Sequence, residues 1–406
     1  SGQRTGLGRV FKAFYYRDFR LMWFGACTSS VGTWMQNLAQ SWLVYDISGS
    51  AFYLGLDAFL AQAPIILFTL FGGVLADRKS RRHILLFSQY LQMFDAFMLA
   101  ALLFFGYRHI WPILVLSFLT GTAQSFGGPA YSALIPTLVD AEDLPNAIAL
   151  NSIQFNLARV IGPVIGGVTL KLLGAVWCFG LNGLSFIAVI FSLYMIRVSF
   201  TPKPSGESVR DSMRAGFDFI RQREGMVPLI LLAFAITAIA FPMIAFLPVF
   251  ARTVFQAGPG TYTALLASSG VGSVIGALIF AGSGKKRGLG KSALITLMCL
   301  GLVMTSFALS RQVFLSCFFL FLSGAVLLSV FAMITSLVQM ITPDNMRGRV
   351  MSVYNGAFRG GMPLGSIVAG AIIQRWSAPP VIAIDGVLIV LLGCYFLFVH
   401  RRVAAL

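Results

Sequence analysis

Long apolar runs separated by short polar segments repeat along the whole chain. A helix needs about 20 residues to cross the hydrocarbon core of a bilayer, and each run approaches or exceeds that length. The runs that predict membrane spans are 19–45, 51–76, 83–105, 110–133, 144–171, 175–196, 227–251, 260–282, 291–309, 312–340, 346–374 and 379–400. The pattern therefore predicts an all-α membrane protein with twelve transmembrane helices.

Composition supports a membrane protein and argues against several other classes. Apolar residues make up 57% and charged residues 11% of the 406 residues, whereas a soluble domain carries about 25% charged residues. Neither GxGxxG nor GxxxxGKS/T occurs, so a dinucleotide or ATP site is not predicted. The five cysteines form no CxxC pair, and no Ser/His/Asp group or metal-binding cluster is apparent. We therefore expect no enzyme activity, no metal and no cofactor.

Positive charge is distributed unevenly between the two sides of the predicted spans. The chain has 30 Lys and Arg against 14 Asp and Glu, which gives a net charge of +16. With the N-terminus in the cytoplasm, the basic loop residues on the outer side are only Arg108, Lys171, Arg252, Arg311 and Arg375. Loops rich in Lys and Arg stay in the cytoplasm. We therefore predict cytoplasmic termini in a bacterial inner membrane, and the lipid bilayer, not nucleic acid, as the partner of this charge.

The longest polar segment, 197–226, divides the chain into two predicted six-helix halves. Its later part, 207–224, has the apolar spacing of an amphipathic helix on the inner leaflet, although a solvated connector is the alternative. Residues 152–163 and 352–363 share Ser, Arg and Pro at equivalent positions, which indicates an internal duplication. The predicted domains are 1–196, 197–226 and 227–406.

Three segments resemble sequences of the major facilitator superfamily. The loop 73–82, GVLADRKSRR, is similar to the superfamily signature GxLaDrxGrr, with Ser80 where Gly is usual. The segment 159–167, RVIGPVIGG, looks like the GPxxGG element of its antiporters, and 347–352, RGRVMS, is similar to the start of span 11 in siderophore and macrolide exporters. The resemblance implies the major facilitator fold, two pseudo-symmetric bundles of six helices, and export of a small molecule by alternating access.

Charged residues around the loop 73–82 are candidates for a conformational latch. Asp77 is a carboxylate among cations at the end of a predicted span, where it can face the positive N-terminus of the span 346–374. The resemblance implies that it also pairs with Arg347 or Arg349. The latch candidates are Gly73, Asp77, Arg78, Arg81, Arg347 and Arg349. The alternative is that the loop only sets the orientation of the protein.

Small residues and prolines predict a bend or a tight helix contact in the span 144–171. The candidates for packing or a hinge are Gly162, Pro163, Gly166, Gly167 and, in the span 346–374, Pro363. Proline removes a helical hydrogen bond, and glycine lets a neighbouring helix approach closely. We expect the partner to be the span 260–282, which is also rich in small residues. Ordinary packing without a hinge is the alternative.

Polar side chains on one face of three predicted spans indicate a central cavity. In the first span, Ser29, Thr33, Gln36, Asn37, Gln40 and Ser41 share a helical face. The predicted substrate-binding residues are Thr33, Gln36, Asn37, Gln40, Asn151, Gln154, Arg159, Asn355 and Arg359. A buried Arg stays charged at any working pH, so it needs a carboxylate or an anionic ligand. Hydrogen bonding between helices, without ligand contact, is the alternative.

Three carboxylates lie inside predicted spans, namely Asp57, Asp95 and Asp385. Surroundings of low dielectric constant favour the neutral acid, so such a group can exchange a proton near neutrality. We expect Asp57 or Asp95 to couple proton entry to export. Asp57 is favoured because the third span is usually less exposed to the cavity in the superfamily. The alternative is a static ion pair with Arg that only orders the bundle.

These features predict a monomeric secondary active transporter that exchanges protons for an amphiphilic small molecule, such as a siderophore or a drug. The arginines also fit an alternative, a carrier of lysophospholipids or organic anions, including a uniporter. A membrane-embedded receptor or scaffold is a third class. The internal repeat and the Asp77 loop argue against it, because a scaffold need not alternate between states.

Overall fold

The computed structural model describes residues 11–197, 209–282, 288–344, 346–399 and 401–405. Its helices form two compact units, Ser1–Leu43 with Ala63–Ser205, and Val44–Gln62 with Gly206–Leu406. Residues 44–62 are the end of the first predicted span and the start of the second, and they pack with the second unit. The sequence-based domain limits therefore stay a prediction.

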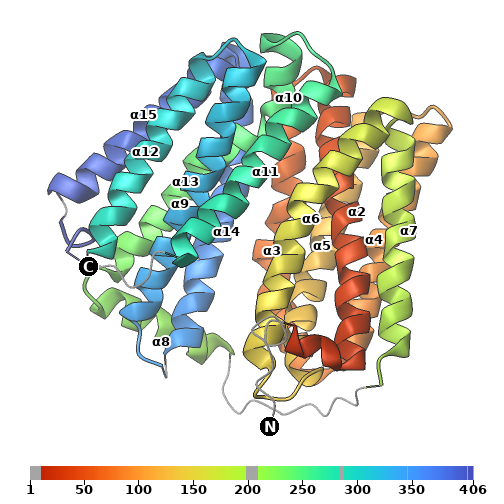
Figure 1. Cartoon of the computed structure of the whole chain (residues 1–406), viewed down its shortest axis with the longest axis horizontal. Coiled ribbons are helices and arrows are strands. Elements are labelled where there is room, and N and C mark those ends of the chain that lie inside the picture. The colour runs from red at the N-terminus through yellow and green to blue at the C-terminus, as the bar shows by residue number, and fades with distance from the viewer. Residues whose placement is uncertain (1–10, 198–208, 283–287, 345, 400, 406) are drawn as a thin grey trace. The chain divides into compact units, whose positions relative to one another are not determined.

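Helices account for nearly all of the first unit (Figure 1). A short 3-10 helix, η1 (Lys12–Tyr15), precedes the long helix α2. The long helices are α2 (Arg17–Ser48), α3 (Ala51–Arg78), α4 (Arg81–Phe104), α5 (Ile110–Leu134), α6 (Leu144–Leu172) and α7 (Ala175–Met195). The 3-10 turn η2 (Ile135–Thr137) follows α5. These bounds agree with the first six predicted spans to within a few residues.

The second unit begins with the amphipathic helix α8 (Val209–Gln222), which packs on α14. The long helices that follow are α9 (Met226–Ala245), α11 (Pro259–Gly282), α12 (Leu289–Leu309), α13 (Val313–Met340), α14 (Arg347–Trp376) and α15 (Ala378–Cys394). A π-helical segment, η4 (Tyr395–Val399), extends α15. The predicted helix in 207–224 is therefore confirmed as a helix, and Ile220 on it is buried.

The predicted continuous span 227–251 is interrupted. Helix α9 ends at Ala245, and the turn α10 (Leu247–Val249) and the π-helical segment η3 (Phe250–Val254) follow. Pro242 and Pro248 lie on either side of the break. Proline has no backbone N–H, so Pro242 removes a hydrogen bond inside α9, whereas Pro248 lies in the first turn of α10, where the N–H would have no helical partner.

Length and hydropathy alone qualify eleven of the described helices as membrane spans. The helix that they leave out is α2, which is 32 residues long but carries the polar stripe recognised in the sequence. Polar side chains lower its mean hydropathy without shortening it. With α2 included, the twelve predicted spans are confirmed as an all-α membrane fold.

The two units use the same packing pattern, as expected for a duplicated six-helix bundle. Helix α4 packs on α5 and α7, and its counterpart α12 packs on α13 and α15. Gly72 lets α3 approach the backbone of α5 at Ser125, and Gly272 lets α11 approach the backbone of α13 at Phe321. Side chains at these positions would collide with the neighbouring helix, so the small residues set the distance between helices.

Candidate functional site

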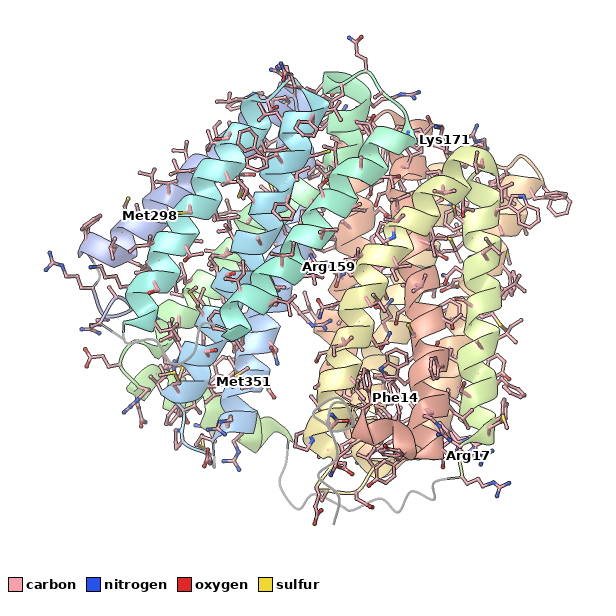
Figure 2. The ribbon with its side chains drawn as sticks, in the orientation of Figure 1. Phe14, Arg17, Arg159, Lys171, Met298 and Met351 are labelled. Carbon is pink, nitrogen blue, oxygen red and sulfur yellow. The ribbon has the colours of Figure 1, made fainter. Side chains whose placement is uncertain are left out.

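Arg159 lies about midway along α6 (Figure 2). Seven of the eight exposed large aliphatic residues of α6 share one face, namely Ile153, Leu157, Ile161, Val164, Ile165, Val168 and Leu172. At 3.6 residues per turn, the centre of this aliphatic face lies about 180° from Arg159, and only Ile148, near the start of the helix, is on the side of Arg159. A continuous exposed aliphatic face is suited to lipid contact. Arg159 therefore points away from the face suited to lipid.

Two aromatic rings accompany Arg159 within the first unit. The guanidinium carbon lies 5.8 Å from the ring centroid of Trp34 on α2, a cation–π contact. The ring of Phe155, one turn earlier on α6, meets Trp34 edge to face at 6.3 Å between centroids. Among the described residues, no carboxylate lies within ion-pair distance of Arg159.

Arg359 occupies a similar place on α14 in the second unit. The exposed aliphatic residues Leu364, Val368 and Ile372 centre about 180° around the helix from it. Its neighbour Phe358 packs edge to face against Phe331 of α13, at 4.7 Å between centroids. Arg359 is exposed, and it has no ion-pair partner among the described residues. Both predicted arginines are therefore turned away from the faces suited to lipid.

Several predicted cavity residues instead hold helices of the first unit together. Asn182 of α7 donates a hydrogen bond to Gln36 at 2.7 Å, and Gln40 donates to Ser117 of α5 at 2.8 Å. These interhelical bonds correspond to the alternative stated for the polar stripe, because each joins α2 to another helix.

The amides predicted on α6 make similar contacts. Gln154 donates to the backbone oxygen of Ala26 at 3.2 Å and to the hydroxyl of Ser30 at 2.8 Å. The hydroxyl of Tyr131 donates to Asn151 at 2.5 Å. Gln154 is buried, and its amide N–H groups are used in hydrogen bonds to α2.

The remaining members of the polar set differ in exposure. Thr33 is half-buried and donates to the backbone oxygen of Ser29 at 2.9 Å, within its own helix. Asn37 on α2 and Asn355 on α14 are exposed. These two amides, together with the two arginines, are the predicted substrate-binding residues that stay open to a ligand.

Asp95 is fully buried between α4 and α5. Its side chain accepts a hydrogen bond from the hydroxyl of Thr120 at 3.0 Å, while its Oδ1 atom has no hydrogen-bond partner among the described residues. One turn away, Gln92 donates to Ser88 at 3.1 Å and accepts from Gln124 at 3.4 Å. Asp95 thus belongs to a polar seam within an otherwise apolar helix contact.

The other two carboxylates within spans lie in the second unit. Asp57 of α3 is buried at 6% exposure. Asp385 of α15 is partly buried, and its Oδ2 atom has no hydrogen-bond partner in the described part of the chain. Among the described residues, neither carboxylate forms an ion pair with Arg159 or Arg359, so the structure does not support a static Arg–Asp pair at those arginines.

The predicted latch is described only in part, since the side chains of Asp77 and Arg78 lie outside the described residues. Arg81 donates to the backbone oxygen of Ala133, at the end of α5, at 2.6 Å. Arg347 forms an ion pair with Asp344 at 2.6 Å, three residues earlier in the chain. Gly72 is the residue at which α3 approaches α5 closely. A Cβ atom added at Gly73 would meet nothing within 4 Å.

The prediction that the glycines in α6 pack on the span 260–282 was wrong. Gly162 and Gly166 face Val31, Trp34 and Met35 of α2, not the span 260–282. In that span, now α11, Gly272 and Gly276 pack against α13. The two spans were paired in the prediction because both are rich in small residues. The helix on which each small residue packs depends on the tertiary structure.

The equivalent small residues of α14 also face a helix of their own unit. Gly361 and Gly365 lie against Phe234 and Ala238 of α9. Pro163 and Pro363 are both buried inside uninterrupted helices. Gly167 is likewise buried in α6.

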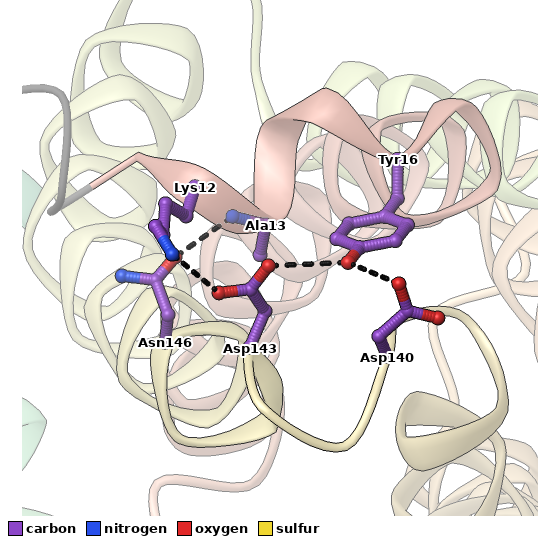
Figure 3. Close-up of polar contacts among 6 residues, drawn as sticks. All are labelled: Lys12, Ala13, Tyr16, Asp140, Asp143 and Asn146. Carbon is purple, nitrogen blue, oxygen red and sulfur yellow. Dashed lines mark hydrogen bonds and ion pairs between the residues drawn. The ribbon is translucent and has the colours of Figure 1, made fainter. Parts of the chain in front are cut away.

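Sequence reasoning missed a polar clamp at the N-terminal end of α2 (Figure 3). The hydroxyl of Tyr16 donates to Asp140 at 2.8 Å and to Asp143 at 3.1 Å. Lys12 pairs with Asp143 at 3.4 Å, and the backbone N–H of Ala13 donates to Asn146 at 2.9 Å. The clamp ties η1 to the segment that leads into α6.

Donation by Tyr16 to nearby carboxylates also changes its acidity. The hydrogen bond to Asp140 is the largest cause, and it raises the pKa of Tyr16 from 10.0 to about 12. Aromatic packing reinforces the clamp, because Phe14 meets Trp23 edge to face at 5.0 Å between centroids. A cluster of aromatic residues beside basic ones at 11–24 was the only sequence signal available.

In the described residues, two units of like packing contain long apolar helices, and the fifth and eleventh spans each carry an arginine opposite an exposed aliphatic face. This is the layout of a membrane transporter of the major facilitator type. The family described as "Transmembrane secretion effector" matches residues 10–405. The chain belongs to this family of the major facilitator superfamily. Its members are transporters and not enzymes.

Three known proteins illustrate the similarity. The chain is 22% identical over 379 residues to the staphyloferrin A transporter of Staphylococcus aureus, covering 92% of this chain and 94% of that protein. It is 24% identical over 389 residues to macrolide efflux protein A of Streptococcus pyogenes, covering 92% and 93%. A crystal structure of a POT family transporter has a TM-score of 0.76 at 12% identity, covering 95% and 96% of the two chains, which confirms the fold.

Proposed function

We propose that the protein is a proton-coupled exporter of amphiphilic small molecules that works by alternating access. The observation that carries the proposal is the placement of Arg159 on the face of α6 opposite to its exposed aliphatic residues, in a chain that an exporter family matches over 10–405. A charged group inside a span is costly, roughly 2.5–3.5 kcal/mol on insertion scales, and such groups mark substrate pathways. Relatives named as a siderophore transporter and a macrolide efflux protein support export of such compounds.

The proposed location is the bacterial inner membrane, with both termini in the cytoplasm and the protein acting as a monomer. The distribution of Lys and Arg supports this orientation. The proposed latch between Asp77 and the start of α14 would hold the cytoplasmic side closed in one state. Arg347 would then have to exchange Asp344 for Asp77 during each cycle.

Asp57 and Asp95 are the proposed proton-coupling carboxylates, with Asp57 favoured. Asp95 lies in the contact between α4 and α5, two helices that pack closely along their length. Asp57 lies in the part of α3 that packs with the second unit, so it belongs to a helix that contributes to both units. A helix of this kind must change its contacts if the units move, and a change of contacts can alter the protonation of a buried acid.

Transport into proteoliposomes tests the coupling. The chain is reconstituted, and uptake of a macrolide and of a siderophore is measured with and without an imposed pH gradient. Asp57→Asn is expected to abolish gradient-driven transport while substrate binding, measured without a gradient, is retained. Asp385→Asn serves as the matched control, because it removes another carboxylate within a span, at a similar distance from the start of its helix. Gradient-driven transport that survives Asp57→Asn rules out Asp57 as the coupling residue.

A carrier of lysophospholipids or organic anions that acts as a uniporter is the second candidate, favoured by the two arginines, which have no carboxylate partner in the described part of the chain. The same proteoliposomes separate the two functions. A uniporter equilibrates its substrate at the same rate whether or not a pH gradient is imposed, whereas a proton-coupled exporter accumulates it against a gradient of the substrate.

A further inference from the structure

The guanidinium of Arg159 has hydrogen-bonding capacity that its surroundings do not use. An arginine carries five N–H donors in a planar fork. The recorded partner of Arg159 is the face of the Trp34 ring at 5.8 Å, and a ring face stabilises the charge without accepting hydrogen bonds in the fork plane. Within the described part of the first unit, no carboxylate is in ion-pair distance to take these donors.

Aromatic surface lies directly beside these donors. Phe155 is 55% exposed and meets the Trp34 ring at 6.3 Å, with an interplanar angle of 71°. Phe155 and Arg159 are four residues apart on α6, so they lie on the same side of that helix. Both point away from the aliphatic face of α6, so lipid chains do not account for the exposed ring.

We propose that this group of three residues, Trp34, Phe155 and Arg159, binds the anionic end of an aromatic substrate, specifically a carboxylate attached to a planar ring. The carboxylate accepts two parallel N–H bonds from the guanidinium, the bidentate geometry in which arginine binds carboxylates. The ring of the substrate lies against Phe155, and aromatic pairs of this kind are favourable in stacked or edge-to-face arrangements. This inference rests on the proposed transport function and names the substrate class at the same site.

The same geometry discriminates against cationic substrates. An ammonium group near Arg159 would be repelled in surroundings of low dielectric constant, where interactions between charges are strong. A neutral amide on the same ring would keep the aromatic contact but lose the charge-assisted pair. The order of affinity expected for one ring is therefore carboxylate first, amide second and amine last.

Equilibrium binding to the purified full chain in nanodiscs of zwitterionic lipid tests this order. The probes are 2-naphthoate, 2-naphthamide and 2-naphthylmethylamine, with cyclohexanecarboxylate as an anion that lacks the aromatic ring and lysophosphatidate as a lipid oxyanion. We expect 2-naphthoate to bind roughly tenfold more tightly than the amide, as one charge-assisted pair provides. Equal or tighter binding of the amine, the cyclohexane acid or the lipid overturns the proposal.

Variants assign the preference to Arg159. Arg159→Gln is expected to remove the preference for 2-naphthoate over 2-naphthamide while affinity for the amide stays unchanged. Arg159→Lys keeps the charge but not the planar fork, so a partial preference remains. The matched control is Arg311→Gln, which removes an exposed arginine from a loop and should leave every affinity unchanged. A preference that persists in Arg159→Gln contradicts the inference.

Two features keep the test decisive. If Arg159→Gln does not fold, as judged by its melting curve, the affinities for 2-naphthoate and 2-naphthamide are compared in Arg159→Lys and Phe155→Leu instead. Phe155→Leu should weaken the binding of both compounds equally, because both use the same aromatic contact. Binding at equilibrium needs no gradient and no transport. A proton-coupled exporter of cationic drugs would fail this test and keep the proposed function, whereas a uniporter of aromatic acids would pass it.

Discussion

Single side chains connect parts of this molecule that are far apart in the sequence. The hydroxyl of Tyr16 reaches Asp140 and Asp143 more than 120 residues later, and Trp23 donates to the backbone oxygen of Leu150 at 2.9 Å. Both contacts join the start of α2 to the region around the start of α6. Because α6 carries Arg159, the clamp at its N-terminal end helps to fix the position of the proposed substrate-binding face.

Tyr16→Phe removes the two hydrogen bonds donated to carboxylates and should lower the melting temperature. The folded-state pKa of Tyr16 is raised from 10.0 to about 12, so its contribution is fully present below pH 10 and is lost as the pH rises through about 12. The difference in melting temperature between wild type and variant should therefore stay constant from about pH 6 to about pH 9. Tyr107→Phe, at an exposed tyrosine outside the spans, is the control. A difference that disappears within this range contradicts the assignment.

Asp95 allows stability and function to be separated at one position. It is 0% exposed and has one hydrogen bond, from Thr120. Replacement of a poorly satisfied buried polar group by an apolar one of similar size is often neutral or stabilising. Asp95→Leu should thus change the free energy of unfolding by only about 0–1 kcal/mol, with a melting temperature equal to or above that of wild type.

Gln92→Leu is the matched comparison for Asp95→Leu in the same seam. Gln92 donates to Ser88 and accepts from Gln124, so its loss leaves partners unsatisfied and should cost about 1–3 kcal/mol. Melting curves in detergent measure both variants. A large loss of stability in Asp95→Leu would mean that the carboxylate has a structural role, and its candidacy for proton coupling would weaken.

Helices were far easier to predict from the sequence than the contacts between them. Long apolar runs located all twelve spans, because a bilayer demands length and hydropathy, which a single sequence records. The partner of each polar or small residue depends on which helices meet. Gln36 and Gln154 are polar, as expected for residues that line a cavity, yet their side chains form hydrogen bonds with neighbouring helices. Gly162 faces α2 instead of the predicted span 260–282.

The sequence could predict those site residues whose charge is energetically costly inside a membrane span. Arg159 and Arg359 were identified because a charge within a span needs a reason, and both lie opposite the aliphatic face of their helix. Trp34 and Phe155 were missed, since aromatic residues in a membrane protein are common and do not stand out by composition. Their contact with Arg159 arises only when α2 and α6 pack together.

Adjacent glycines in α3 provide a prediction at the level of the helix pair. A Cβ atom at Gly72 would meet the backbone oxygen of Ser125 and so force α3 away from α5, which should cost about 1–3 kcal/mol in Gly72→Ala. Gly73→Ala meets nothing within 4 Å and should be neutral or slightly stabilising in a helix. Melting temperatures of the two variants measure the difference.

Gly73→Ala also tests the proposed latch. If the variant folds as wild type but loses transport, then Gly73 acts in a state other than the one described, as the latch proposal requires. If transport is unchanged, Gly73 has no role in the latch. A loss of stability in Gly73→Ala equal to that in Gly72→Ala would contradict the helix contact itself.

At the scale of the whole molecule, the two compact units do not coincide with the two halves of the sequence. Residues 44–62 belong by chain order to the first half but pack with the second unit. Three contacts hold them there. Asp46 pairs with Arg252 at 3.4 Å, and both Ser50 and the backbone N–H of Ala51 donate to Gln374 at 2.9 Å. Gly55 completes the contact against the backbone of α14 at Ser366.

Under the proposed alternating access, these contacts between 44–62 and α14 must open once in each transport cycle, since they join parts of the two sequence halves. A cross-link between Ser50→Cys and Gln374→Cys, made with a short reagent that forms a disulfide with each thiol, in a background without the five native cysteines, should therefore stop transport. Binding of 2-naphthoate is measured in parallel, to separate a closed pathway from an unfolded protein. Reduction of the cross-link should restore transport, and each single cysteine variant treated in the same way should remain active. Full transport by the cross-linked protein would mean that residues 44–62 stay with the second unit throughout the cycle, and the first unit would then have to move without them, about the chain near residues 43 and 63.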